Sequence, residues 1–204
     1  MIAIVNYGSG NSQAIGNIYG RSGIPYVIAE RPEQLEGADR YVLPGVGAFD
    51  QCMSELNRSG MREALERHVR NERKPILGIC VGMQILSDSS EEGSEPGLGW
   101  VQGRVVRFDT SDLDDPPPLP HMGWNTVRPI RDVPLFDGVD LAIGCYFLHS
   151  YYFSCERRED VVAVTEYVLE FPCAVQREHV YGVQFHPEKS HQAGIQFLKN
   201  FARV

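Results

Sequence analysis

The sequence lacks the cysteine and histidine patterns that would hold a disulfide framework or a zinc ion. Its five cysteines are an odd number, and no two have Cys-x-x-Cys spacing. His186 and His191 have no matching ligand cluster nearby in the sequence. We therefore expect no disulfide scaffold and no metal, and the cysteine usage fits a reducing compartment, here the cytoplasm.

Long apolar runs and a basic stripe are also missing. No run of 18 apolar residues occurs, which argues against a transmembrane helix. The apolar start at residues 1–5 has no basic segment and meets a Gly8-Ser9-Gly10 turn, so we expect a first strand there and no secretory signal. The formal net charge is -8. Neither nucleic acid nor a membrane is therefore an expected partner.

A dinucleotide fingerprint is incomplete as well. Gly8-x-Gly10 follows the first expected strand and Glu30 ends the second, but Gln13 stands where a third glycine is needed. We expect no cofactor.

What the sequence does contain is enough apolar material for one well-packed domain. The chain has 204 residues, of which 43% are hydrophobic and 23% charged. A chain of this length buries about 70% of the surface that its unfolded form exposes. We therefore expect one domain, residues 1–204, with an ordinary hydrophobic core.

The first half of the chain alternates short apolar runs with helical patterns. This alternation favours a parallel sheet covered by helices on both faces. Expected strands are 2–6, 26–29, 41–43 (stopped by Pro44-Gly45) and 75–79; expected helices are 11–22, 49–71 with an interruption near Ser59-Gly60, and 81–86.

The second half is rich in β-type runs, and a helix closes the chain. The segments 88–99 and 109–120 are expected to be loops, and we attach no function to the proline-rich 109–120 excursion. The fold class expected is thus α/β, a single domain with a central, mostly parallel sheet flanked by helices and with antiparallel additions. The expected elements are strands 101–108, 146–153, 161–167, 174–176 and 180–185 and a helix at 192–201.

Cys80 is the most informative residue. It stands in Gly78-Ile79-Cys80-Val81-Gly82, after an expected strand and before an expected helix, which is the context of a nucleophile elbow. The glycines allow a sharp turn that exposes the cysteine, and the helix N-terminus favours its thiolate form. The alternative is a small buried core residue, the common state of a free cysteine.

His186 and Glu188 form the natural partners of such a nucleophile. His186 ends an apolar strand, and in an extended chain its side chain and that of Glu188 point to the same side. Both Cys80 and His186 follow strands, and sites of parallel sheets gather at the carboxyl ends of strands. The alternative is a surface histidine beside a solvated glutamate.

A third loop, Pro44-Gly45-Val46-Gly47, also follows an expected strand. Its glycines permit a close backbone approach, which suits amide donors around an oxyanion, although a plain turn would look the same.

Together these three segments, in this order, resemble the class I, or triad-type, glutamine amidotransferases. The motif Pro120-His121-Met122-Gly123-Trp124-Asn125 resembles more narrowly the glutaminase subunits of imidazole glycerol phosphate synthases. The resemblance runs from Ile2 to Phe201.

This resemblance implies a role for each matching residue. Cys80 would be the nucleophile, His186 the general base and Glu188 its orienter. Amides of Val46, Gly47 and Val81 would form the oxyanion hole. The substrate glutamine would be held by Gln84, Glu92, Ser150 and Tyr151, and the face turned to the partner would include Asn11, Trp124 and Lys189.

The resemblance also implies an acceptor enzyme for the ammonia. A (β/α)8 cyclase alone needs about 250 residues, so the cyclase must be a separate subunit. The present chain and the cyclase would together form a heterodimeric enzyme of histidine biosynthesis. Three alternatives remain open: a paralogue that feeds ammonia to an amidotransferase for surface-polysaccharide sugars, a stand-alone cysteine hydrolase, and a binding subunit without catalysis.

Overall fold

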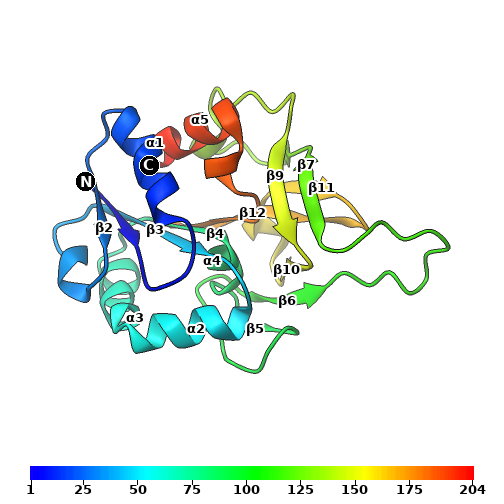
Figure 1. Cartoon of the computed structure of the whole chain (residues 1–204), viewed down its shortest axis with the longest axis horizontal. Helices are drawn as coiled ribbons and strands as arrows, with labels where there is room; N and C mark the ends of the chain where they lie inside the picture. Colours follow the sequence, from blue (N-terminus) through cyan, green and yellow to red (C-terminus); the bar gives the residue numbers. More distant parts are fainter.

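An eight-stranded sheet runs through the protein, as seen in a computed structural model that describes residues 1–204 (Figure 1). Its first five strands are parallel and its last three antiparallel. This arrangement confirms the expected fold class. In spatial order the strands are β2 (Tyr26–Ala29), β1 (Ile2–Val5), β3 (Arg40–Gly45), β4 (Ile76–Cys80), β13 (Val180–Val183), β12 (Glu170–Arg177), β11 (Val161–Glu166) and β8 (Arg128–Pro129).

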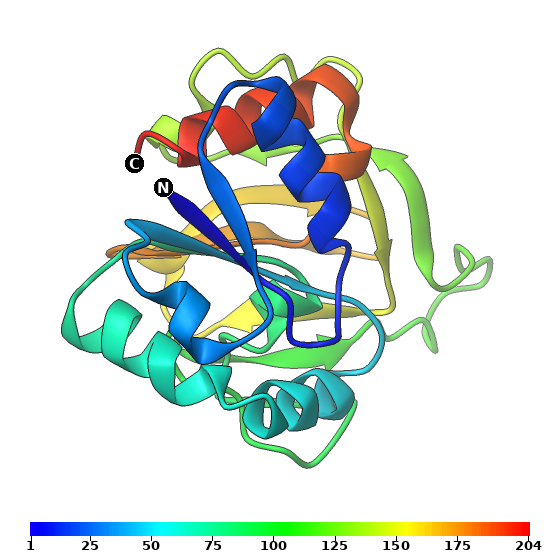
Figure 2. The ribbon, with the colours of Figure 1, turned by 60° about the vertical axis from the view of Figure 1, so that its left-hand side comes forward.

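Helices cover both faces of the sheet, because each buries one apolar stripe. On one face lie α1 (Ser12–Arg21) and α5 (His191–Phe201), which contact each other (Figures 1 and 2). On the other lie α2 (Phe49–Arg58), α3 (Met61–Leu65) and the π-helical turn Glu66–Asn71. The remaining helical turns are α4 (Val81–Gln84) and the 3-10 segments Pro32–Leu35, Pro134–Phe136, Arg158–Asp160 and Pro187–Lys189.

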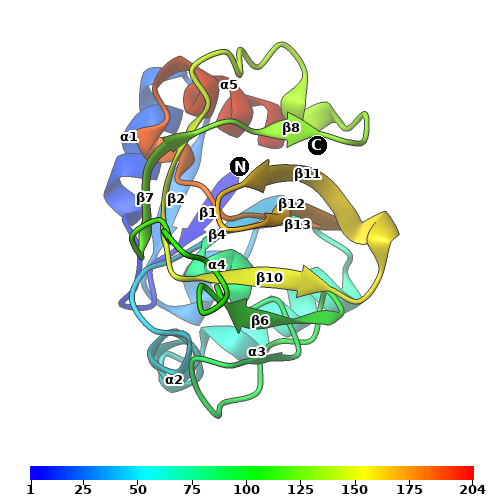
Figure 3. The same ribbon diagram turned by 90° about the vertical axis from the view of Figure 1, so that its right-hand side faces the viewer.

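Two small sheets stand against the antiparallel end of the main sheet (Figure 3). One contains β10 (Tyr151–Cys155), β6 (Gly103–Arg107) and β5 (Ser89–Ser90), and the other pairs β7 (His121–Asn125) with β9 (Cys145–His149). Their buried side chains join those of the main sheet in one continuous hydrophobic core.

The structure corrects several expected strands. The run 146–153 is two strands, because the chain turns at Ser150 and β9 and β10 enter different sheets. β3 does not stop before Pro44 but continues to Gly45. The N–H of Tyr41 donates to the carbonyl of Pro75 on the β4 side, so the nitrogen of Pro44 points to the β1 side. There it lies beyond the last pair of the two strands, Ile4 with Val42.

The other differences concern strand lengths. β12 extends well beyond 174–176, and it includes Pro172 opposite an irregular stretch of β11. β7, β8 and β5 were not expected. No helix is long and apolar enough to cross a membrane.

Candidate active site

Cys80 lies at the end of β4, where the chain turns sharply into α4. Its φ of 56° and ψ of -116° are rare for a residue with a side chain. Gly82 permits this turn by lying against β3, because a Cβ there would be 1.9 Å from the carbonyl oxygen of Leu43. The geometry is that of an elbow which presents its central side chain at the carboxyl edge of the sheet.

His186 follows β13, the parallel neighbour of β4, and so lies at the same edge of the sheet as Cys80. Its Nδ1 is 2.9 Å from Oε1 of Glu188, and both side chains are almost fully buried, at 4% and 3% exposed. Burial by itself would lower the pKa of His186, but its interactions with Cys80 and Glu188 outweigh burial and raise it. The ring is therefore held with Nδ1 toward Glu188 and Nε2 free for Cys80.

Three hydrogen bonds hold the loop that carries His186, and two of them connect it to β9. The N–H of His186 donates to the carbonyl of Tyr146 at 2.8 Å. The hydroxyl of Ser190 donates to the carbonyl of His186 at 2.6 Å and accepts from the N–H of Tyr146 at 3.0 Å. The position of the histidine thus depends on β9, an element outside the main sheet.

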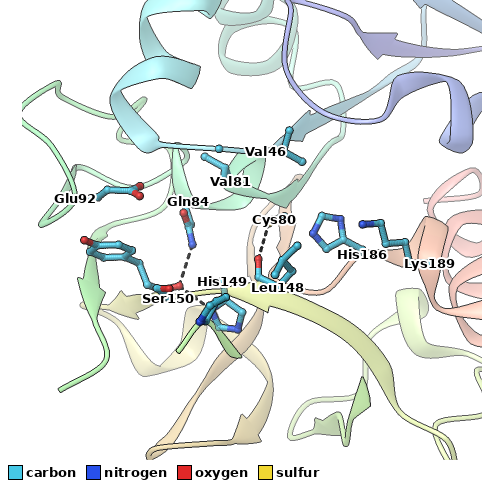
Figure 4. Close-up of a pocket in the computed structure, with 13 residues that line it drawn as sticks. Val46, Cys80, Val81, Gln84, Glu92, Leu148, His149, Ser150, His186 and Lys189 are labelled. Atoms are coloured by element: carbon cyan, nitrogen blue, oxygen red, sulfur yellow. Dashed lines mark hydrogen bonds between the residues drawn. The ribbon is translucent and has the colours of Figure 1, made fainter. Parts of the chain in front are cut away.

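A cavity of about 260 Å³ opens beside Cys80 (Figure 4). Most of the site residues predicted from the sequence line this cavity. Glu188 lies behind His186, and Asn11 and Trp124 lie outside the cavity. The lining residues are Val46, Gly47, Cys80, Val81, Gln84, Glu92, Pro120, Leu148, His149, Ser150, Tyr151, His186 and Lys189.

Gln84 is fixed by two hydrogen bonds from one atom. Its Nε2 donates to the carbonyl of Tyr151 and to Oε1 of Gln184, both at 3.0 Å. Both protons of the amide nitrogen therefore point into the protein, and Oε1 is the atom left to accept from a ligand. Gln184 in turn donates toward the sulfur of Cys80 at 3.8 Å.

Glu92 reaches the cavity from the 88–99 loop and caps a helix. Its Oε2 accepts from the N–H of Phe49, the first residue of α2, at 2.8 Å. A carboxylate at this place can bind a cationic group of a ligand.

The three expected oxyanion donors are in different states. Val81 is the first residue of α4, where an amide has no partner within the helix. The N–H of Val46 donates to the hydroxyl of Ser9 at 2.9 Å, and that hydroxyl also donates to the carbonyl of Val46 at 2.9 Å. Because a trans peptide places N–H and C=O on opposite sides, the N–H of Gly47 points away from Ser9.

The residues expected at a partner face have separate environments. Trp124 is 41% exposed and stacks on His191, with ring centroids 4.8 Å apart. Lys189 holds its ammonium 5.3 Å from the ring centre of Tyr146. Asn11 caps α1, since its side chain accepts from the N–H of Ala14 at 3.1 Å.

Sequence reasoning missed four residues that shape this site. Leu148, His149 and Pro120 line the cavity, and Ser9 holds Val46. Pro120 stands in a motif that carried the resemblance, and His149 directly precedes Ser150 and Tyr151, so their places in the sequence were usable signals. Nothing in the local sequence indicates the pairing of Ser9 with Val46, 37 residues away.

No three His, Cys, Asp or Glu side chains gather closely enough to hold a metal ion.

Comparison with known proteins places the chain among glutamine amidotransferases. The family model of class-I glutamine amidotransferases matches residues 4–204. A protein named imidazole glycerol phosphate synthase subunit HisH from Bdellovibrio bacteriovorus is 52% identical over the whole length of both chains, and one of the same name from Leptospira borgpetersenii is 45% identical, also over the whole length of both.

Solved structures show the same fold at lower identity. A crystal structure of a glutamine amidotransferase superposes with a TM-score of 0.75 at 18% identity, covering 100% of this chain and 99% of the other. A chain of PurLQS from Thermotoga maritima gives a TM-score of 0.75 at 14% identity, covering 99% and 97%.

Proposed function

The chain belongs to the class-I glutamine amidotransferase family, and from this premise we propose that it is the glutaminase subunit of an imidazole glycerol phosphate synthase. The observation that carries the proposal is the pairing of an elbow cysteine with a histidine–glutamate pair at one edge of the sheet. Full-length identity of 52% to a relative of that name supports the choice of acceptor reaction.

In the first step Cys80 attacks the side-chain amide of glutamine. The thiolate forms a bond to the amide carbon, and the negative charge moves to the amide oxygen, where the amides of Val81, Gly47 and, once it is released from Ser9, Val46 stabilise it. His186, protonated on Nε2, gives that proton to the departing nitrogen, and the C–N bond breaks to release ammonia. Cys80 is left as a glutamyl thioester.

In the second step water releases the product. Nε2 of His186, now neutral, removes a proton from water, and the resulting hydroxide attacks the thioester carbon. The C–S bond breaks, glutamate leaves, and the thiolate of Cys80 and the protonated His186 are restored. Glu188 keeps Nδ1 protonated and stabilises the cationic ring throughout, as the third member of a triad does.

Substrate glutamine occupies the cavity beside Cys80 in this proposal. Glu92 offers a carboxylate and Gln84 a carbonyl oxygen for the ammonium group of glutamine. Ser150 and Tyr151 line the same cavity and supply further contacts to the ligand.

Ammonia then passes to a partner, which we propose is a (β/α)8 cyclase subunit in a cytoplasmic heterodimer. The cyclase would use it to make imidazole glycerol phosphate and the by-product AICAR. We assign to the face toward this partner exposed Trp124 and Met122 (66% exposed), Lys189 from the lining of the cavity, and Asn11 at the start of α1.

The test is reconstitution with a cyclase subunit from the same organism. We expect glutamine-dependent formation of imidazole glycerol phosphate, and no product when Cys80→Ala replaces the native chain. Transfer of nitrogen to a surface-polysaccharide sugar by its amidotransferase, without activity on the cyclase, would identify the paralogous function instead. Full glutaminase activity without any partner would favour a stand-alone hydrolase.

A further inference from the structure

A chain of hydrogen bonds between buried histidines leads to the glutamine side of the cavity. Nδ1 of His121 is 2.9 Å from Nε2 of His149, and Nδ1 of His149 is 2.8 Å from the carbonyl of Tyr151. At the other end, Nδ2 of Asn125 is 3.1 Å from Nε2 of His121. Both histidines are buried, at 3% and 7% exposed.

The two ends of this chain fix its direction. The amide of Asn125 has one orientation, because its Nδ2 also donates to the carbonyl of Glu166 at 2.8 Å and its Oδ1 accepts from the N–H of Thr126 at 2.8 Å. Asn125 therefore donates to His121. The carbonyl of Tyr151 can only accept, so His149 must carry its proton on Nδ1.

Only neutral histidines fit between these ends. His149 must accept on Nε2, so His121 donates from Nδ1 and accepts on Nε2. Each ring then carries one proton and each nitrogen one partner. Burial lowers the pKa of His121 to about 4 and that of His149 to about 3, which agrees with two neutral rings.

The surrounding rings leave His121 little freedom. It stacks between Phe147 and Tyr167, with ring centroids 4.8 and 4.1 Å away and interplanar angles of 19° and 21°. Through its hydrogen bond to His149, this fixed side chain connects β7 to the end of β9, next to the turn at Ser150.

The carbonyl of Tyr151 is where this chain meets the proposed glutamine site. It also accepts from Nε2 of Gln84 (Figure 4). The second proton of that amide goes to Gln184, and Gln184 donates toward Cys80. The orientation of the Gln84 amide, and hence of its free Oε1, depends on the position of this carbonyl.

We propose that His121 and His149 are positioning residues for the substrate glutamine, which hold the carbonyl of Tyr151 so that Oε1 of Gln84 faces the ligand. The inference rests on the proposed glutaminase function. His121 does not line the cavity, so its effect must pass through His149.

The test compares two substitutions of His121 in the full chain assembled with its cyclase partner. His121→Phe keeps the stack on Phe147 and Tyr167 but removes both hydrogen bonds. His121→Gln keeps one donor and one acceptor on the side chain. We expect His121→Phe to raise the KM for glutamine about tenfold, the worth of about one buried hydrogen bond, with little change in kcat. His121→Gln should recover most of that loss.

A second variant tests the same proposal if His121→Phe fails to fold. Asn125→Asp replaces the amide donor by an acceptor, which draws the proton of His121 to Nε2 and removes the donor to His149. It should raise the KM to the same extent. Activity with added ammonium salt does not use the glutamine site and should stay unchanged in every variant.

His68 provides the matched control. It is 1% exposed, stacks on Tyr41, and has its Nδ1 3.0 Å from Glu72, but it lies outside the cavity. His68→Phe should lower the melting temperature and leave the KM unchanged. The proposal is overturned if His121→Phe leaves the KM unchanged, if His121→Gln is as impaired, or if His68→Phe raises the KM equally. A native chain no more active than Cys80→Ala would instead refute the glutaminase function itself.

Discussion

Cys80 shows at the scale of one residue how backbone and chemistry are linked. Its positive φ places the thiol at the cavity, and such strained conformations persist where surrounding packing enforces them. We predict that Cys80→Ala lowers glutamine hydrolysis by about a thousandfold or more, because the nucleophile acts as a unit with its base. Steady-state glutaminase assays of the complex measure the loss. A mutant with near-native turnover would exclude Cys80 as the nucleophile.

The same variant separates glutamine hydrolysis from ammonia use. Cys80→Ala removes only the sulfur atom of a buried side chain and should leave the partner face intact. The mutant complex should therefore bind the cyclase and form product from ammonium salt at high pH. Loss of this ammonia-dependent activity would show that the two reactions are not separable.

Glu188 and His186 should differ in the size of their effects. In the proposed mechanism His186 moves protons in both steps, whereas Glu188 only holds Nδ1 and stabilises the cation. We predict that Glu188→Gln, which keeps the size of the side chain, lowers kcat less than His186→Ala does. Kinetics of both variants, with circular dichroism as the control for folding, would measure this. An equal loss with intact fold would indicate a more direct role for Glu188.

Residues close in sequence were the ones whose geometry could be predicted. The spacing of His186 and Glu188 is local, and the structure has them in contact. The Ser9–Val46 and His121–His149 pairs join residues 37 and 28 positions apart, and no local pattern encodes such contacts. The roles of the catalytic and binding residues remain predictions.

At the scale of elements, the strand–elbow–helix unit depends on close packing at Gly82. Alanine has the higher helix propensity by about 1 kcal/mol, but its Cβ would lie 1.9 Å from the carbonyl oxygen of Leu43. The clash is with a backbone atom, which cannot move aside as a side chain can, so it outweighs the gain in helix propensity. We therefore predict that Gly82→Ala lowers the free energy of unfolding by about 3 kcal/mol. Urea denaturation followed by circular dichroism measures it.

Gly20 is the matched control for this substitution. It lies in α1, and a Cβ there would make only ordinary contacts, the nearest at 3.4 Å from the ring of Tyr26. Gly20→Ala should be neutral or stabilising. If Gly82→Ala were equally neutral, close packing of Gly82 against Leu43 would not be what stabilises the elbow.

Elements with a strong local pattern were predicted well, and elements defined by their neighbours were not. The strand 26–29 and the helices near 11–22 and 192–201 follow from apolar periodicity. The break at Ser150 lies inside a continuous β-type run, so only the separate pairing of β9 and β10 reveals it. β7 contains Gly123 and Asn125, which are poor strand formers, and pairing with β9 stabilises it.

At the scale of the whole molecule, the site is assembled from both halves of the chain. β3 and β4 lead to the proposed oxyanion loop and nucleophile, β13 leads to the proposed base, and β9 contributes to the cavity wall. Val46 lines the cavity and is 46% exposed. A partner docked over Val46 can therefore contact the proposed oxyanion loop directly.

We predict that the isolated chain hydrolyses glutamine poorly and that its partner, loaded with acceptor, activates it. The first reason is that a glutaminase without its acceptor enzyme wastes ammonia. The second is that the N–H of Val46 donates to Ser9 and is therefore unavailable to an oxyanion. One missing oxyanion donor costs about 3 to 4 kcal/mol, or a factor of roughly a hundred to a thousand. The glycines beside Val46 allow its peptides to rotate, and the partner must favour the rotated state by differential binding.

The measurement is steady-state glutaminase activity of the chain alone, with partner, and with partner plus an acceptor analogue. Turnover should rise across the three conditions. Ser9→Ala removes the hydroxyl that holds Val46, so it should raise the activity of the isolated chain by about fivefold, the worth of about 1 kcal/mol. The fully loaded complex, in which that hydrogen bond is already broken, should respond little to the substitution. Equal turnover in all three conditions would refute the switch and favour a hydrolase that acts without a partner.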